Sequence, residues 1–128
     1  MRRSNIKWFV LFFVSLFVAS VAAAPASVPD EKLAELGYKI KAEVEAIVRF
    51  QLKDRQYVDN RHLIIPDGSS VAFLVTTVHP CRGMSANRIT ARTRDSKNLS
   101  LGDKLQIKHE GRTVDHCEIE RIQKLESL

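Results

Sequence analysis

The sequence predicts an α+β domain in which one N-terminal helix packs on an antiparallel sheet of about five strands. Apolar residues recur every three to four positions over residues 30–53, which is the period of a helix. From residue 61 to residue 122 they alternate with period two, which is the period of a strand. The links between the alternating stretches are short, and short links join antiparallel neighbours.

The predicted helix begins at Asp30, which can cap it, and Glu31 favours its first turn. Its apolar stripe consists of Leu33, Leu36, Ile40, Val44, Ile47 and Gln51. Gly37 lies inside this stretch and weakens the helix by about 1 kcal/mol. A break at that point is therefore an alternative to one continuous helix.

The strands follow the connection "RQYVDN". The first is expected in "RHLII", before the turn "PDGS". "SVAFLVTTVH" is apolar on both alternations, which predicts a central strand covered on both faces. "NRITARTR", "KLQIKH" and "TVDHCEIERI" complete the sheet, with a longer turn "DSKNLSLGD" and a short turn "EGR" between them.

The N-terminus has the order of a secretory signal peptide: a basic segment, an apolar run and a small-residue junction. A membrane anchor is the alternative, but the run spans only about 17 residues, short for a membrane helix. We expect residues 1–24 to be the signal peptide, residues 25–29 a short linker and residues 30–128 a single domain. The protein would then be secreted, extracellular, monomeric and free of the membrane after cleavage.

Removal of the signal leaves 17 basic residues against 15 acidic ones. Eight basic residues and three acidic ones lie between residues 81 and 112. This basic block is either a solvated strand face or a surface that binds a polyanion. The residues expected to meet RNA phosphates are Arg88, Arg92, Arg94, Lys104 and Lys108.

The two cysteines, Cys81 and Cys117, both lie in the mature chain. An even number of cysteines in a secreted protein predicts one disulfide between them. No CxxC, HxxxH or HExxH spacing occurs, so the sequence predicts no metal site and no cofactor. Asn98 opens a glycosylation sequon, which would be used only in a eukaryotic host.

The order of three short motifs resembles the secreted fungal guanyl-preferring ribonucleases of the barnase-like superfamily. "LAELGYKIK" is similar to the helix of that family, and "SANRITAR" to the strand that carries its catalytic arginine. "LQIKHEG" followed by "DHCE" is similar to its closing segment. The resemblance implies a ribonuclease-like α+β fold, with Arg88 as the matching arginine, His109 as the matching histidine and His62 as a loose match to the other site histidine.

RNA cleavage of this kind needs a carboxylate as base, a histidine as acid and an arginine for the phosphate. The strand expected to carry the base holds Phe73 and no acidic residue. The sequence therefore favours a protein without efficient catalysis. An active endoribonuclease would have to use Asp95, Glu110 or Glu118 instead.

The resemblance and the secretion signal together predict a fungal effector that binds host RNA or a host protein. Three alternatives remain open. The first is an active secreted endoribonuclease. The others are a β-sandwich effector with one disulfide and a bacterial periplasmic binding module. His116 is a further histidine with a possible role at any such site.

Overall fold

The computed structural model describes residues 28–85 and 88–128. The predicted signal peptide and the first part of the linker lie outside these residues. The helix α1 (Asp30–Glu35) comes first and is followed by strands and one 3₁₀ turn. In chain order these are β1 (Tyr38–Val44), β2 (Ala46–Val48), η1 (Leu52–Asp54), β3 (Gln56–Asp59), β4 (His62–Pro66), β5 (Ala72–Thr77), β6 (Arg88–Arg92), β7 (Asn98–Ser100), β8 (Lys104–His109) and β9 (Arg112–Ser127).

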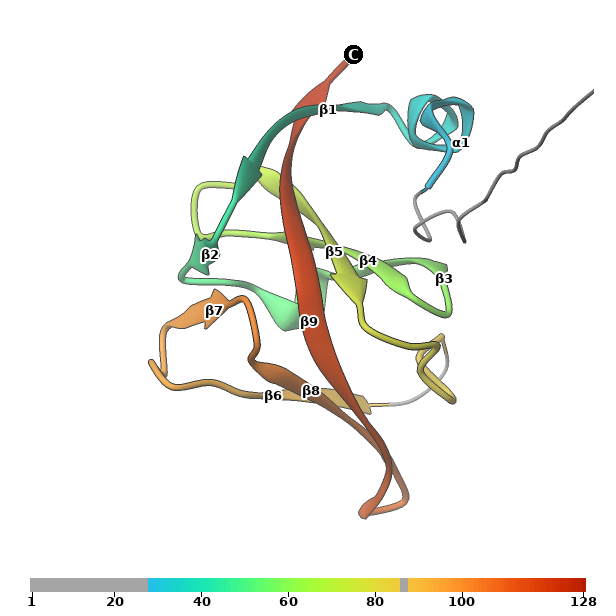
Figure 1. Cartoon of the computed structure of the whole chain (residues 1–128), viewed down its shortest axis with the longest axis vertical. Helices are drawn as coiled ribbons and strands as arrows, with labels where there is room; N and C mark the ends of the chain where they lie inside the picture. Colours follow the sequence, from blue (N-terminus) through green and yellow to red (C-terminus); the bar gives the residue numbers. More distant parts are fainter. Residues whose placement is uncertain (1–27, 86–87) are drawn as a thin grey trace, which may run out of the picture.

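Among the described residues, seven strands form one curled antiparallel sheet in the order β3-β4-β5-β9-β8-β6, with β1 also paired to β9. The 16-residue β9 is the central strand of this sheet. Its first half pairs with β8 and its second half lies between β5 and β1, as Figure 1 shows. The short strands β2 and β7 form a separate two-stranded ribbon.

The predicted fold class is wrong. Over residues 28–85 and 88–128 the protein is mostly β, with a curled half-barrel sheet and one six-residue helix, and this part of the chain does not have the helix-packed five-stranded ribonuclease architecture. The helix inserts Leu33 into a small cluster beside β5, so it covers only one corner of the sheet. None of the described helices is both apolar and long enough to cross a bilayer.

The helix ends early because Gly37 adopts a left-handed conformation with φ of 93°. The Gly37 amide bonds back to the carbonyl of Ala34, which closes the last turn. Beyond it, Tyr38 to Val44 is also an alternating stretch, and it pairs with the second half of β9. The apolar stripe taken for a helix is thus shared between a short helix and two strands, because long-range pairing outweighs local propensity.

Several strands predicted from period two are confirmed. All six residues of β5 are buried, as expected for a strand covered on both faces. "KLQIKH" forms β8, and the closing stretch forms β9, which continues five residues further than predicted. The sequence interpretation missed β1, β2 and β7, and it also missed β3, which lies in the predicted connection "RQYVDN".

The main core lies inside the curl of the sheet. Ile65, Val75, Leu105 and Ile122 are buried there, and the β2–β7 ribbon closes it with Ile47. The predicted disulfide is confirmed: Cys81 and Cys117 are bonded, both side chains are buried, and their Cα atoms lie 6.0 Å apart. This bond links the loop after β5 to the middle of β9.

The β8–β9 hairpin turns at Glu110 and Gly111, with φ of 51° and 80°. Two successive positive φ angles are typical of a type I′ turn, whose twist suits a tight antiparallel hairpin. The hairpin sets the register in which β8 presents its side chains beside β9.

Candidate functional site

Strands β6, β8 and β9 place a set of polar and basic side chains on one side of the sheet. Residues directly opposite each other in an antiparallel pair share a face, and so do residues two apart in one strand. The pairs Arg88–Lys108, Thr90–Gln106 and Arg92–Lys104 join β6 to β8, and Gln106–His116 and Lys104–Glu118 join β8 to β9. We call this set the basic face: Arg88, Thr90, Arg92, Lys104, Gln106, Lys108, His116 and Glu118.

The residues between them face the other way. Ile89 lies opposite Ile107 and is buried in the core, and Leu105 is fully buried. The alternation of "NRITARTR" and "KLQIKH" therefore separates a core side from a charged side. This places four of the five residues predicted to meet phosphates on one surface.

The basic face brings like charges together. Arg92 is opposite Lys104, and Arg88 is opposite Lys108. None of these four cations forms an ion pair with any carboxylate of residues 28–85 and 88–128. Like charges directly opposite each other destabilise a sheet, so this arrangement costs stability.

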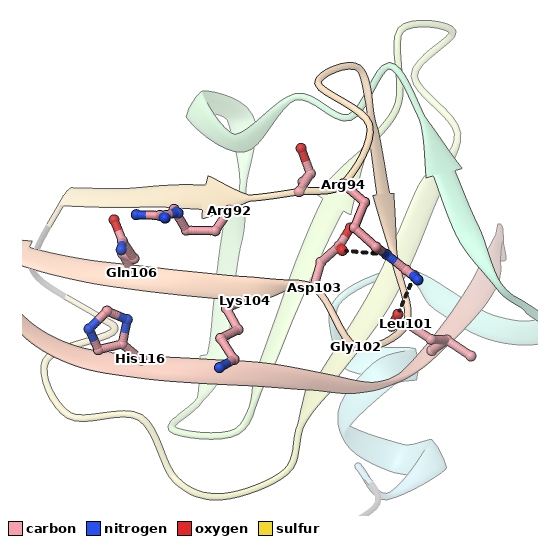
Figure 2. A pocket seen from close by; sticks show the side chains of 9 residues that line it. Arg92, Arg94, Leu101, Gly102, Asp103, Lys104, Gln106 and His116 are labelled. Atoms are coloured by element: carbon pink, nitrogen blue, oxygen red, sulfur yellow. Dashed lines mark hydrogen bonds and ion pairs between the residues drawn. The ribbon is translucent and has the colours of Figure 1, made fainter.

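A cavity of about 530 Å³ opens at one end of the basic face. Figure 2 shows Arg92, Lys104, Gln106 and His116 around it, from β6, β8 and β9. The remaining lining residues are Thr93, Arg94, Leu101, Gly102 and Asp103. Three basic side chains and one imidazole against one carboxylate make this cavity attractive to an anion.

Arg94 is the fifth residue predicted to meet phosphates. It lies beyond the end of β6, and its guanidinium group contacts other residues of the protein. Its Nε lies 3.6 Å from Oδ1 of Asp103, and a terminal nitrogen donates to the Leu101 carbonyl at 3.2 Å. Asp103 is buried and accepts the Ser100 amide at 2.7 Å. Figure 2 draws the two contacts of Arg94, and together with the hydrogen bond from Ser100 they fix the turn between β7 and β8. We therefore assign Arg94 to the rim of the cavity, where it holds that turn.

The middle of the basic face consists of the polar residues Thr90, Gln106 and His116. Gln106 is buried to 8% exposure, and the Thr90 hydroxyl lies 3.4 Å from its side-chain oxygen. His116 lies beside Gln106 and is exposed. The sequence interpretation gave His116 only a general role and did not single out Gln106. Period two in "KLQIKH" and "TVDHCEIERI" places each of them on a strand, but only the β8–β9 register brings the two together.

The structure does not bring together the three residues that the ribonuclease resemblance proposed for catalysis. Arg88 lies on the edge strand β6. His109 ends β8, one residue past Lys108 and so on the side of the strand that Leu105 and Ile107 occupy, but its side chain is 61% exposed, unlike theirs. The hairpin carries it beyond the core, which explains the difference.

His62 lies in β4, which β5 and β9 separate from β8. It is buried, and its Nδ1 lies 2.7 Å from Oδ1 of Asp59. Burial raises the pKa of Asp59, but the Arg61 amide and His62 outweigh this effect and the net pKa is lowered. His62 and Asp59 therefore form a pair that stabilises the β3–β4 hairpin.

The alternative bases are dispersed as well. Asp95 accepts the Lys97 amide within its own turn, and Glu110 occupies the β8–β9 turn. Glu118 alone of the three belongs to the basic face, opposite Lys104. Phe73, at the position expected to hold a base, is buried in β5.

The comparisons with known proteins give a family but no activity. No curated protein and no solved structure matches the chain. A family profile described as a family of unknown function, DUF6491, matches residues 4–127. That match spans almost the whole sequence, and the protein therefore belongs to the DUF6491 family.

Proposed function

We propose that this protein is a small exported β-sheet module, stabilised by one disulfide, that binds an anionic ligand on the basic face. This proposal is closer to the predicted binding module than to a ribonuclease-like effector, because the fold lacks the ribonuclease architecture. Export and a host-directed role stay predictions from the sequence.

The observation that carries the proposal is the register of β6 against β8. It sets Arg92 opposite Lys104 and Arg88 opposite Lys108, and no carboxylate of the described residues forms an ion pair with any of the four, although Glu118 lies opposite Lys104 in β9. The two like-charged pairs lie four residues apart, or about 13 Å along the strands. An anionic ligand would relieve the repulsion in both pairs, so binding recovers stability that the free protein lacks.

The composition of the basic face indicates how the ligand is held. The face contains no Phe, Tyr or Trp on which a base could stack, so RNA would be held through its phosphates. Such contacts are independent of sequence and weaken steeply with salt. The cavity beside Gln106 adds hydrogen-bonding groups for one anionic group of the ligand.

The test is binding of a labelled single-stranded RNA at low and moderate salt, beside a sulfated polysaccharide of similar length. We compare the wild type with Arg92→Ala/Lys104→Ala. The control variant is Lys32→Ala/Lys53→Ala, which removes the same charge from exposed positions outside the face.

The face variant is expected to lose about tenfold or more in affinity, since each charged contact contributes about 1 kcal/mol or more. For RNA its salt slope should also fall by about 1.4, or about 0.7 for each phosphate that is no longer neutralised. Equal losses of affinity in the two variants would mean that the net charge of the protein alone causes the loss, and this would contradict the proposal. Binding of the polysaccharide alone would assign the face to sulfate or carboxylate groups.

A second function is favoured by one feature of β9. Glu118 and His116 lie two residues apart on the basic face, beside Lys104 and Gln106. A carboxylate and an imidazole next to cations are the groups that general base and acid catalysis on a phosphodiester needs. Incubating the same RNA with the wild type, Glu118→Gln and His116→Ala distinguishes the two functions. Cleavage abolished by either substitution would favour the enzyme, and intact RNA would favour the binding module.

A further inference from the structure

A second cluster of polar groups lies on the opposite side of β9 from the basic face. Asp115 and Cys117 flank His116 in the strand, so they point away from the side that His116 occupies. A ring nitrogen of His79, a carboxylate oxygen of Asp115 and the sulfur of Cys117 all lie within 4.8 Å of one another. Cys81, bonded to Cys117, brings a fourth potential ligand to the same place.

The imidazole of His79 is held as metal-binding histidines are. Its Nδ1 lies 2.9 Å from the carbonyl oxygen of Pro80, and a carbonyl can only accept, so Nδ1 carries the proton. In the neutral ring Nε2 then keeps its lone pair. A ring N–H donated to a backbone carbonyl is the usual outer contact of a histidine that binds a metal.

The carboxylate of Asp115 is oriented in a similar way. Oδ2 accepts the Arg82 amide at 2.9 Å, and Oδ1 accepts the His116 amide at 2.8 Å. These two backbone hydrogen bonds hold the carboxylate in a fixed orientation. Asp115 therefore offers oxygen atoms at a defined position in the cluster.

We propose that reduction of the Cys81–Cys117 disulfide converts this cluster into a zinc site with two thiolates, His79 and Asp115 as ligands. Two sulfurs, one imidazole and one carboxylate form a four-coordinate set of the types that Zn²⁺ prefers. In the oxidised protein the sulfurs are bonded to each other, and the remaining two ligands form a weak site. The disulfide thus decides whether the metal binds.

The chemistry balances with a dithiol as reductant. The dithiol gives two electrons and two protons to the disulfide, forming two cysteine thiols and its own disulfide. Zn²⁺ then displaces the two thiol protons and forms two zinc–sulfur bonds. Bonds of about 2.0–2.3 Å in a tetrahedral site bring ligand atoms to roughly 3.3–3.8 Å from each other. For His79, Asp115 and Cys117, whose ligand atoms lie within 4.8 Å of one another, this requires only a small closure, and the two sulfurs move apart from bonding distance once the disulfide is reduced.

The usual sequence patterns of metal ligands do not detect this site, because in each half of it a single residue separates the two ligands. The halves are His79-Pro80-Cys81 and Asp115-His116-Cys117. One half follows β5 and the other lies in β9, and the pairing of these two strands brings them together. No metal is predicted from the sequence because CxxC and HxxxH spacings describe ligands within one turn or one helix.

The experiment uses the mature protein in oxidised form and after reduction by a phosphine or dithiol, titrated with Co²⁺ as a spectroscopic probe for Zn²⁺. The variants are His79→Ala and Asp115→Ala, with His116→Ala as the matched control on the other side of β9. Circular dichroism of each reduced sample is recorded with and without Zn²⁺, because the reduced chain could unfold.

Reduced wild type is expected to bind one Co²⁺ with thiolate-to-cobalt absorption, and Zn²⁺ should raise its thermal midpoint or refold it. His79→Ala and Asp115→Ala should each weaken binding at least tenfold, whereas His116→Ala should not. The oxidised protein should give no such spectrum. Absence of binding to reduced wild type would overturn the proposal. Binding unchanged in His79→Ala and Asp115→Ala, or without any gain in structure, would also overturn it, since the two cysteines alone would then account for the metal.

Discussion

The two halves of β9 differ in the charged residues that lie beside them. Three charged residues of the second half form ion pairs with opposite charges: Arg121 lies 2.7 Å from Glu43 of β1, Glu120 lies 3.6 Å from Arg61, and Glu126 lies 3.7 Å from Lys39. Beside the first half, the neighbouring strands set Arg92 opposite Lys104 and Arg88 opposite Lys108. The same sheet therefore contains one region in which opposite charges form ion pairs and another region in which positive charges are in excess.

This difference in charge pairing has opposite effects on the stability of the sheet. Opposite charges across strands each contribute roughly 0.2–1 kcal/mol, and like charges cost similar amounts. The charges of the second half thus help to hold β1 and the β3–β4 turn in place. The like-charged pairs beside the first half weaken the free sheet, which is what the proposed binding of an anion would offset.

The largest effect should come from the disulfide, which is attached to β9 where its partner changes from β8 to β5. Cys81→Ala/Cys117→Ala should lose about 4 kcal/mol of unfolding free energy, as expected for a loop of this length. Urea denaturation in the presence of a chelator measures the loss.

The control for this prediction is reduced wild type with the same chelator, which should show a similar loss. A change below about 1 kcal/mol would mean that the loop after β5 stays in place on β9 without the bond, and that packing around Ile119 and Ile122 is sufficient.

A smaller effect is expected in the neutralised half. Glu43 accepts hydrogen bonds from Arg121, and the Gln123 amide donates to it at 2.8 Å. The hydrogen bond from Arg121 is the largest cause that lowers the pKa of Glu43. Glu43→Gln should cost about 1 kcal/mol or less at neutral pH, since both partners are substantially exposed.

The pH dependence follows from the direction of that shift. A carboxyl group with a lowered pKa in the folded state stabilises the protein above its ordinary pKa, and this contribution is lost as the pH falls through the folded-state value. Wild type and Glu43→Gln should therefore differ at neutral pH and converge in acid. A difference that persists below both pKa values would assign the loss to packing instead of charge.

The smallest effect has the opposite sign. Arg92→Glu places a carboxylate opposite Lys104 and should stabilise the free protein by about 0.2–1 kcal/mol while weakening polyanion binding. Lys53→Glu, on the exposed η1 turn, is the control and should leave stability nearly unchanged. Loss of stability in Arg92→Glu would show that the basic face is not strained by its own charges.

The sequence predicts the β-rich part of the fold better than its N-terminal third. Period two in "KLQIKH" and an unbroken apolar run in β5 are strong local signals, and both strands are found. Residues 38–44 also fit a helix, and only pairing with β9, more than 75 residues later in the chain, makes them a strand. The alternation of this stretch is compatible with a strand as well, but the local pattern does not show which of the two periods the distant partner selects.

The candidate site, too, can be predicted only in part from the sequence. The excess of cations between residues 81 and 112 locates the basic face, and alternation identifies most of its members. The cavity could not be foreseen, because Gln106 and His116 meet only through the β8–β9 register. The two bulges of β9, near Ile107 and Thr76 of its partners, also have no sequence signal that we could read.

The order of the strands along the chain has a kinetic consequence. Strands β1, β5 and β8 all precede β9 and all pair with it, so none of them can complete its pairing until β9 has been synthesised. The β1–β9 and β5–β9 pairings also close long loops, and contacts of that kind are the slowest to form. A nascent chain that still lacks β9 would therefore have no central strand for its sheet and would remain largely unfolded.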